Sequence, residues 1–90
     1  MKITQNTLKR RFEVDAGART AFLNYRLEDG VITLTHTEVP EAVNGRGIGT
    51  ALAKFALEYA RREGLKVVPQ CSFVVAFLAG HPEYEGLLVR

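Results

Sequence analysis

The hydrophobic pattern of this chain changes its period once, at a glycine-rich segment in the middle of the sequence. Up to Val39, apolar residues alternate with polar ones, which is typical of strands with one buried face. From Ile48 onward they recur at spacings of three and four residues, which predicts a helix with one apolar stripe. Residues 44–49, between the two patterns, contain three glycines. We therefore expect a sheet formed by the first part of the chain and a helix packed against it.

Three strands are expected before the glycine segment. Alternation or enrichment in β-branched residues marks residues 8–15, 21–27 and 31–39. Asp29 and Gly30 stand between the second and third strands and predict a hairpin, because both residues tolerate positive φ. Pro40 ends the third strand. Together the three strands are predicted to form an antiparallel meander.

A strand–helix–strand unit is expected to follow the meander. The long helix begins near Ile48, and Gly64 lies just past its end, where a left-handed residue is common. A short apolar run at residues 65–68 predicts a fourth strand, parallel to the third because a helix connects them. Residues 73–79 predict a last short helix that Ser72 caps. This helix is apolar on all sides, so we expect it to be buried.

The length and composition predict one small domain, residues 1–90, of the α+β class with four or five strands and two helices. Hydrophobic residues are 47% and charged residues 24%, which excludes a disordered chain. The apolar runs are too short to span a bilayer, so no membrane contact is expected. The net charge of +2, without a long basic run, does not favour nucleic acid as a partner.

Cysteine usage adds a prediction about location. Cys71 is the only cysteine, so an intramolecular disulfide is excluded, and a lone thiol fits the reducing cytoplasm. The spacing of His and Cys residues does not match a structural zinc site, and no metal is expected.

The glycine segment reads Asn-Gly-Arg-Gly-Ile-Gly and precedes the long helix. Glycines let a ligand approach the backbone closely, and the N–H groups at a helix N-terminus bind anions. The segment therefore predicts a phosphate or pyrophosphate site, with Arg46 as an added charged contact. It lacks the lysine of a P-loop and the glycine spacing of the dinucleotide fingerprint. The alternative is a tight strand-to-helix turn with close packing.

Four segments together resemble the small single-domain GNAT-like N-acetyltransferases, which belong to the acyl-CoA-dependent N-acyltransferase superfamily. They are His36-Thr37-Glu38-Val39-Pro40, Gly45-Arg46-Gly47-Ile48-Gly49, Val68-Pro69-Gln70-Cys71-Ser72-Phe73-Val74 and His81-Pro82-Glu83-Tyr84. The glycine segment resembles the superfamily's Q/R-x-x-G-x-G/A loop, although Asn44 stands where Gln or Arg is usual. The resemblance runs from about Phe12 to the C-terminus. It implies a GNAT-like minimal fold, with an antiparallel meander, a βαβ unit and a short C-terminal helix.

The same resemblance implies transfer of an acetyl group from acetyl-CoA to an amine. The glycine segment would hold the coenzyme A pyrophosphate, and the pantetheine arm would run along the end of the third strand. The implied cofactor-binding residues are Thr37, Val39, Val43, Asn44, Gly45, Arg46, Gly47, Ile48 and Gly49. The usual acceptor-binding helices have no counterpart here. We therefore expect an acceptor pocket that is open or completed by another subunit, such as a second copy in a homodimer, for a small-molecule or protein amine.

Cys71, His36 and Glu38 are the candidate catalytic residues. Cys71 ends a strand and precedes a helix, where the helix dipole favours the thiolate; the alternative is a buried small apolar residue. His36 is expected on the strand next to Cys71 and is able to accept a proton near neutral pH; the alternative is a core histidine. Glu38 is an alternative base, as a glutamate is in many GNAT enzymes. By simple alternation, His36 and Glu38 share the face of Ile32 and Leu34.

Three further residues carry weaker predictions. Glu41 is another candidate base, and Tyr84 would protonate the departing thiolate if it acted as a tyrosine does in some GNAT enzymes. The alternative for Tyr84 is packing against the last helix, and for His81 it is a role at a helix end. Two other functions also stay open. One is a non-catalytic coenzyme A-binding or regulatory module, and the other is a phosphate-site interaction domain, which lacks an aromatic and basic platform.

Overall fold

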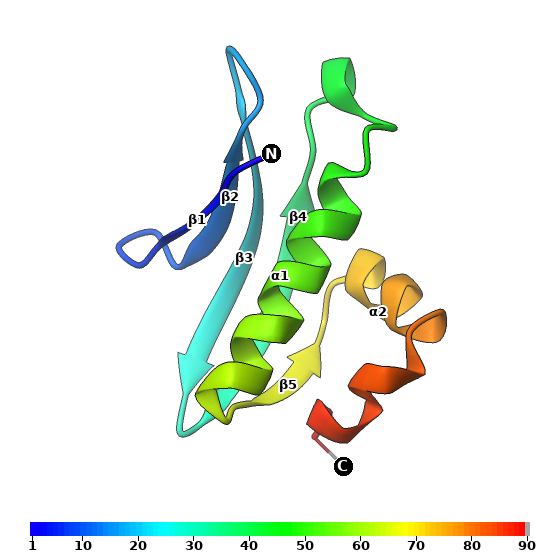
Figure 1. The fold of residues 1–90 in the computed structure, drawn as a ribbon. Coiled ribbons are helices and arrows are strands. Elements are labelled where there is room, and N and C mark those ends of the chain that lie inside the picture. The colour runs from blue at the N-terminus through cyan, green and yellow to red at the C-terminus, as the bar shows by residue number, and fades with distance from the viewer. Residues whose placement is uncertain (90) are drawn as a thin grey trace.

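The computed structural model describes residues 1–89, and Figure 1 shows their fold. The elements in chain order are β1 (Ile3–Asn6), β2 (Arg11–Asp15), β3 (Thr20–Glu28), β4 (Val31–Glu38), the 3₁₀ turn η1 (Glu41–Val43), α1 (Ile48–Glu63), β5 (Lys66–Pro69), α2 (Ser72–Ala79) and the 3₁₀ turn η2 (Pro82–Leu87). The expected α+β fold, a meander followed by a strand–helix–strand unit and a short helix, is confirmed.

The five strands lie in the sheet in the order of the sequence, β1 to β5. The pairs from β1 to β4 are antiparallel, and β4 and β5 are parallel, as the connection through α1 requires. Asp29 and Gly30 form the tight β3–β4 turn with φ of 52° and 77°. Gly64 ends α1 in the left-handed conformation, as predicted.

The N-terminal part of the sheet differs from the prediction. The expected first strand, residues 8–15, begins only at Arg11 and is the second strand of the sheet, because β1 precedes it. Lys9 and Arg10 lie in the turn between them, and Arg10 has a left-handed φ of 54°. The Lys9 backbone N–H donates to Asn6 Oδ1 at 3.0 Å and closes this turn. β1 is short and mostly polar, so it gives no hydrophobic signal.

The hydrophobic core lies between α1 and one face of the sheet. The apolar stripe of α1 is buried as predicted, and Phe12 of β2 is completely buried against it. The ring of Phe12 is 5.0 to 5.5 Å from the rings of Tyr25, Phe55 and Tyr59. A buried aromatic cluster of this kind adds to the free energy of unfolding through both area burial and ring geometry. Phe12 therefore fixes the position of α1 on the sheet.

The other face of the sheet is mostly polar. Residues directly opposite each other on paired strands share a face. The register therefore places two rows of residues from β2, β3 and β4 on this face. One row is Arg11, Asn24 and His36, and the other is Glu13, Phe22 and Glu38. We call this surface the polar face.

The last helix, α2, is less buried than the sequence suggests. Only Val74 and Phe77 of α2 are buried, whereas Phe73 and Val75 are 41% and 50% exposed. An eight-residue helix beside α1 buries one side only, and a uniformly apolar sequence does not reveal which side (Figure 1). Cys71, not Ser72, is the N-cap residue. Among the described helices, none is long and apolar enough to cross a bilayer.

Candidate functional site

The glycine segment has the open backbone that a ligand would need. Gly45 and Gly47 have φ of 88° and 76°, and Gly47 is the N-cap residue of α1. Nothing lies within 4 Å of a Cβ built at either position. The left-handed turn into α1 therefore accounts for glycine at both positions. The two glycines also leave space beside a helix N-terminus whose first N–H groups have no partner within the helix.

Gly49 has a different explanation. A Cβ built at Gly49 would lie 2.7 Å from Cζ of Phe73, so this glycine allows the first turn of α2 to approach α1 closely. Close packing therefore explains Gly49, and the left-handed turn explains Gly45 and Gly47, so the tight-turn alternative stays open beside the phosphate-site prediction.

A hollow of about 180 Å³ lies beside the glycine segment. Its lining is Val39, Asn44, Gly45, Gly47, Ile48, Gly49, Thr50 and Phe73. Most of the predicted cofactor-binding residues are thus brought together in one place. Thr50 and Phe73 were not predicted, since Phe73 reaches the hollow only through the packing of α2 on α1. Val43 and Arg46 instead line a second hollow, next to Met1 and Lys2.

The strands β4 and β5 separate beyond their paired segment. Their parallel pairing ends where Leu34 meets Pro69. The backbone N–H groups of Gln70 and Cys71 both donate to the Leu34 carbonyl oxygen, at 3.0 and 2.9 Å, as the chain turns away into α2. Residues 35–38 of β4 continue without a β5 partner. The gap beside them is where the pantetheine arm is predicted to run.

An irregularity in β4 changes which side chains face this gap. Tyr25 of β3 pairs with Leu34, but the preceding residue, Asn24, pairs with His36. Thr35 is therefore an extra residue, a β-bulge, and the alternation of faces reverses after it. The expectation that His36 and Glu38 share the face of Ile32 and Leu34 is wrong, because both lie on the polar face. Thr37, which pairs with the buried Leu23, faces the interior instead.

Thr37 is the polar neighbour of Cys71. The Oγ1 atom of Thr37 lies 3.1 Å from Sγ of Cys71, a residue that is 8% exposed. Burial raises the pKa of the Cys71 thiol, but hydrogen bonds from Thr37 and from the backbone N–H groups of Val74 and Phe73 together lower it below the ordinary value. The predicted Cys71–His36 pair is not formed, because the bulge turns His36 to the other face.

His36 and Glu38 form their own pair on the polar face. Nε2 of His36 lies 2.9 Å from Oε1 of Glu38, and the two side chains are 58% and 50% exposed. The ring of Phe22 lies edge-on to the His36 ring at 6.2 Å. His36 is thus not a core histidine. The pair stands on the part of β4 that has left β5, beside the gap, which is where a proton acceptor for the predicted reaction is needed.

The remaining candidates lie elsewhere. The Tyr84 hydroxyl donates to Oε2 of Glu58 at 2.7 Å, and burial together with Glu58 raises the pKa of Tyr84 to about 12. Glu58 is ten residues past the start of α1, about 15 Å along the helix from the glycine segment. His81 stacks on Phe77 at 3.9 Å. Tyr84 also lies against α2, with its ring centroid 6.2 Å from that of Phe77, which is the packing alternative for this residue. His81 follows the end of α2, which is the alternative for it, and Glu41 is exposed in η1.

The comparisons with known proteins agree with this geometry. Residues 11–87 match the family model described as GCN5-related N-acetyl-transferase. Protein NATD1 of Mus musculus is 31% identical over 85 residues, which are 91% of this chain and 77% of that protein. Human Protein NATD1 is also 31% identical over 85 residues, which are 91% of this chain and 75% of that protein.

A solved structure shows the same fold. The solution structure of a GCN5-like protein from Staphylococcus aureus superposes with a TM-score of 0.76 at 27% sequence identity, over 98% of this chain and 87% of that one. The matched region includes the glycine segment, the separated end of β4 and the start of α2. The chain is therefore a member of the GCN5-related N-acetyltransferase family.

Proposed function

We propose that this protein transfers an acetyl group from acetyl-CoA to an amine. The observation that carries the proposal is the position of the glycine hollow, next to the end of β4 that no longer pairs with β5. Val39, which follows β4, and Phe73, in the first turn of α2, both line the hollow, and they belong to the two sides of the gap. A ligand with an anionic end and a narrow arm fits this shape.

The residues present fit coenzyme A at both ends. The free space over Gly45 and Gly47 at the start of α1 suits the pyrophosphate, because backbone N–H groups and the helix dipole favour an anion there. The unpaired edge of β4 at residues 35–38 offers backbone partners for the amides of the pantetheine arm. When bound, acetyl-CoA supplies an acetyl group already activated as a thioester.

In this proposal the His36–Glu38 pair takes the proton of the acceptor amine. As the amine nitrogen forms its bond to the acetyl carbon, it loses a proton, which the imidazole of His36 accepts. Glu38 fixes the orientation of the ring and stabilises the imidazolium that results. The carbon–sulfur bond breaks, and the electron pair leaves with the coenzyme A sulfur.

A covalent route through Cys71 is the second mechanism. The Thr37 contact favours the thiolate, which is the attacking form. However, Cys71 is nearly buried, so the gap would have to admit the thioester up to Sγ. A non-catalytic coenzyme A-binding module is the second candidate function, and the separation of Cys71 from His36 favours it, because no nucleophile–base pair is formed.

Intact-protein mass spectrometry and coenzyme A release separate these options. Incubation with acetyl-CoA and a mixture of amines should release coenzyme A only when an amine is present. His36→Gln and Glu38→Gln should lower this release at least tenfold and leave acetyl-CoA binding unchanged, whereas Glu28→Gln, at the far end of β3, should change neither. An acetyl adduct on Cys71 would establish the covalent route. Binding of acetyl-CoA without release of coenzyme A in the presence of amines would identify a non-catalytic coenzyme A-binding module. The acceptor, a homodimer and the cytoplasmic location remain predictions.

A further inference from the structure

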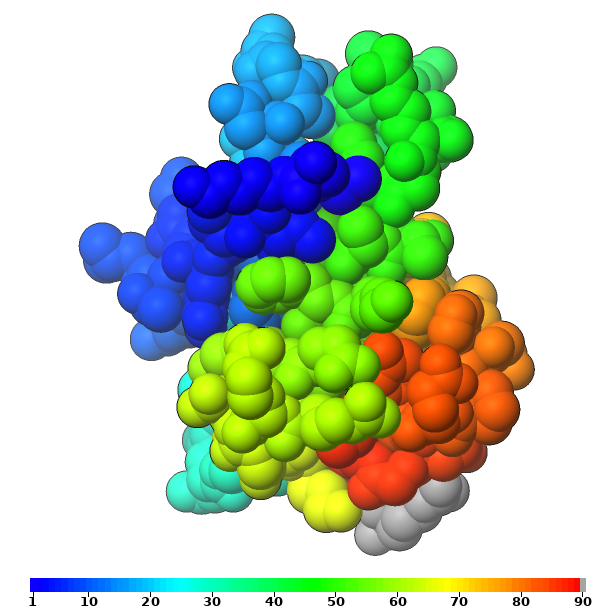
Figure 2. Space-filling view, in the orientation of Figure 1, coloured from blue at the N-terminus to red at the C-terminus, as the bar shows by residue number. Residues whose placement is uncertain are grey.

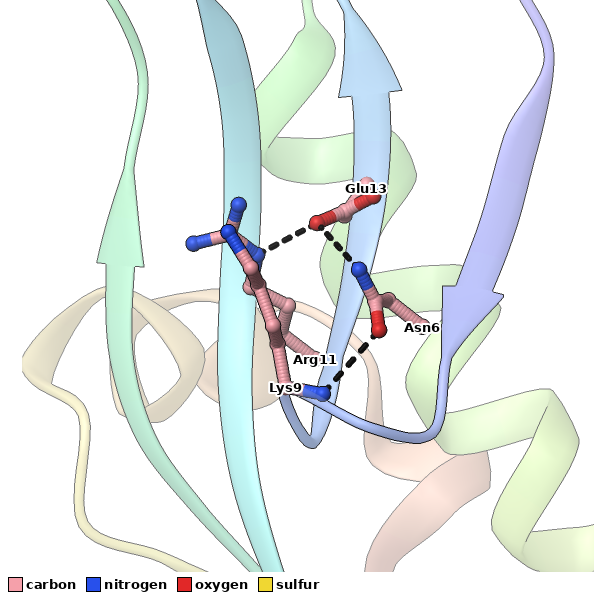
Figure 3. A network of polar contacts seen from close by, with 4 residues as sticks. All are labelled: Asn6, Lys9, Arg11 and Glu13. Atoms are coloured by element: carbon pink, nitrogen blue, oxygen red, sulfur yellow. Dashed lines mark hydrogen bonds and ion pairs between the residues drawn. The ribbon is translucent and has the colours of Figure 1, made fainter.

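A second charged feature of the polar face lies away from the gap, next to the β1–β2 turn. It is a shallow hollow of about 440 Å³, and we call it the basic hollow. Its lining is Lys9, Arg10, Arg11, Asn24, Tyr25, Arg26 and Thr35. Four of these side chains are cationic and none is acidic, in a chain whose net charge is only +2. Figure 3 shows the side chains of Lys9 and Arg11 close together on this surface.

Glu13 offsets only part of this positive charge, and Arg11 and Lys9 both lower its pKa. Arg11 is ion-paired with Glu13, and this contact lowers the pKa of Glu13. Within residues 1–89, the side chains of Lys9, Arg10 and Arg26 form no ion pair, and all three are exposed. Gathering like charges costs repulsion, which an anionic ligand would relieve.

The cations are held in place by the backbone. Arg10 has a left-handed φ of 54°, and its carbonyl oxygen accepts a hydrogen bond from the Tyr25 N–H at 2.9 Å. The turn that carries Lys9 and Arg10 is thereby attached to β3, the strand that carries Arg26. The guanidinium of Arg11 lies 4.4 Å from the centre of the Phe22 ring. The backbone of the basic hollow and the side chain of Arg11 are therefore fixed by contacts within the protein.

The basic hollow and the His36–Glu38 pair share one face. Arg11, Asn24 and His36 are neighbours in one row across β2, β3 and β4. Adjacent strands are about 4.8 Å apart, so Arg11 is about 10 Å from His36 along this row. A ligand that places an amine at the gap would reach the basic hollow by lying across the sheet.

On the basis of the proposed function, we propose that the acetyl acceptor is an acidic polypeptide and that the basic hollow binds its carboxylates. The surface is open, whereas sites for small ligands are usually enclosed. An extended chain advances about 3.3 Å per residue, so 10 Å corresponds to about three residues between the amine and the first acidic side chain. The cations would thus select acceptors by charge, at a distance from the reacting atoms.

Peptide binding in the absence of acetyl-CoA tests this proposal separately from the proposed function. The probes are two eight-residue peptides with a free N-terminal amine, a fluorophore at the C-terminus, and either Glu or Gln at positions 3–5. Fluorescence anisotropy at low salt should show at least tenfold tighter binding of the Glu peptide. Lys9→Glu/Arg26→Glu should lose this preference. Lys54→Glu/Arg62→Glu, with the same charge change on exposed positions of α1, should retain it.

The outcomes are distinct. Equal binding of the two peptides, an unchanged preference in Lys9→Glu/Arg26→Glu, or tighter binding of a single-stranded oligonucleotide of equal charge would overturn the proposal. If the double variant does not fold, Lys9→Gln and Arg26→Gln are tested singly, and each should reduce the preference. Acetyl-CoA titration of the same variants should match the unmodified protein. If the unmodified protein does not bind acetyl-CoA, that result would count against the proposed function and not against peptide binding at the basic hollow.

Discussion

Replacing Thr37 by valine should slow the alkylation of Cys71 at neutral pH. The substitution keeps the shape of the side chain and removes the hydroxyl that lies 3.1 Å from Sγ of Cys71. The hydrogen bonds from the N–H groups of Val74 and Phe73, which also lower the pKa of the thiol, remain. The variant therefore isolates one contribution to the stability of the thiolate.

The expected magnitude follows from the strength of this hydrogen bond. A hydrogen bond to a charged group contributes about 1.5 to 3 kcal/mol, and about 1.4 kcal/mol changes the thiolate fraction tenfold. Thr37→Val should therefore raise the pKa of the thiol and lower the thiolate fraction about tenfold or more, at any pH where the thiol is mostly protonated. Thiolates of higher pKa react faster, with a Brønsted slope of about 0.5, so the observed rate should fall about threefold.

The assay is the rate of iodoacetamide labelling of Cys71 as a function of pH, followed by intact mass. In Thr37→Val, the rise of the rate with pH should move to higher pH, whereas Thr37→Ser, which keeps the hydroxyl, should behave like the unmodified protein. Because the folded pKa is lowered, the thiolate stabilises the fold above the ordinary pKa of the thiol, and this gain is lost as the pH falls through the folded value. A pH profile that is identical in Thr37→Val would refute the role assigned to Thr37.

Three further predictions concern packing and charge. Gly49→Ala gains about 1 kcal/mol of helix propensity but displaces the half-exposed ring of Phe73, at a cost of about 1 kcal/mol. The free energy of unfolding should therefore hardly change, while the affinity for acetyl-CoA falls. A loss of several kcal/mol in urea denaturation would mean that the ring cannot move. Phe12→Ala, in the completely buried ring cluster, should cost about 3 to 5 kcal/mol, and a cost below 1 kcal/mol would contradict its role in the core. Burial and Glu58 raise the pKa of Tyr84 to about 12. In denaturant titrations, the free energy of unfolding of the unmodified protein should therefore exceed that of Tyr84→Phe below pH 10, and the difference should shrink between pH 10 and 12. A difference that stays constant with pH would show that Glu58 and burial do not raise this pKa.

Much of the fold could be predicted because local signals agreed with each other. The alternation in β2 and β3, the hairpin at Asp29 and Gly30, and the long helix that ends at Gly64 all match the structure. β1 was missed because a short polar strand at a sheet edge is fixed by its partner and not by its own hydrophobicity. The exposure of α2 was missed because an apolar sequence does not specify which side is covered.

The site could be predicted only in part. The residues of the glycine segment are adjacent in sequence, so a motif can identify them. The bulge at Thr35 leaves no mark in the sequence, since residues 31–38 keep a regular composition. Because of this one extra residue, the neighbour of Cys71 is Thr37 and not His36. Similarly, Phe73 enters the hollow only through the packing of α2 on α1.

Calorimetric titration of acetyl-CoA into two glycine variants tests the central claim most directly. Gly47→Asp places a carboxylate where the pyrophosphate is proposed to lie. Gly30→Asp is its matched control, because Gly30 has nearly the same φ, 77° against 76°, and equally open surroundings, but lies in the β3–β4 turn. Gly47→Asp should weaken binding at least tenfold, about 1.4 kcal/mol or more, and Gly30→Asp should leave it unchanged. Equal affinity of a folded Gly47→Asp and the unmodified protein would contradict binding at the glycine segment.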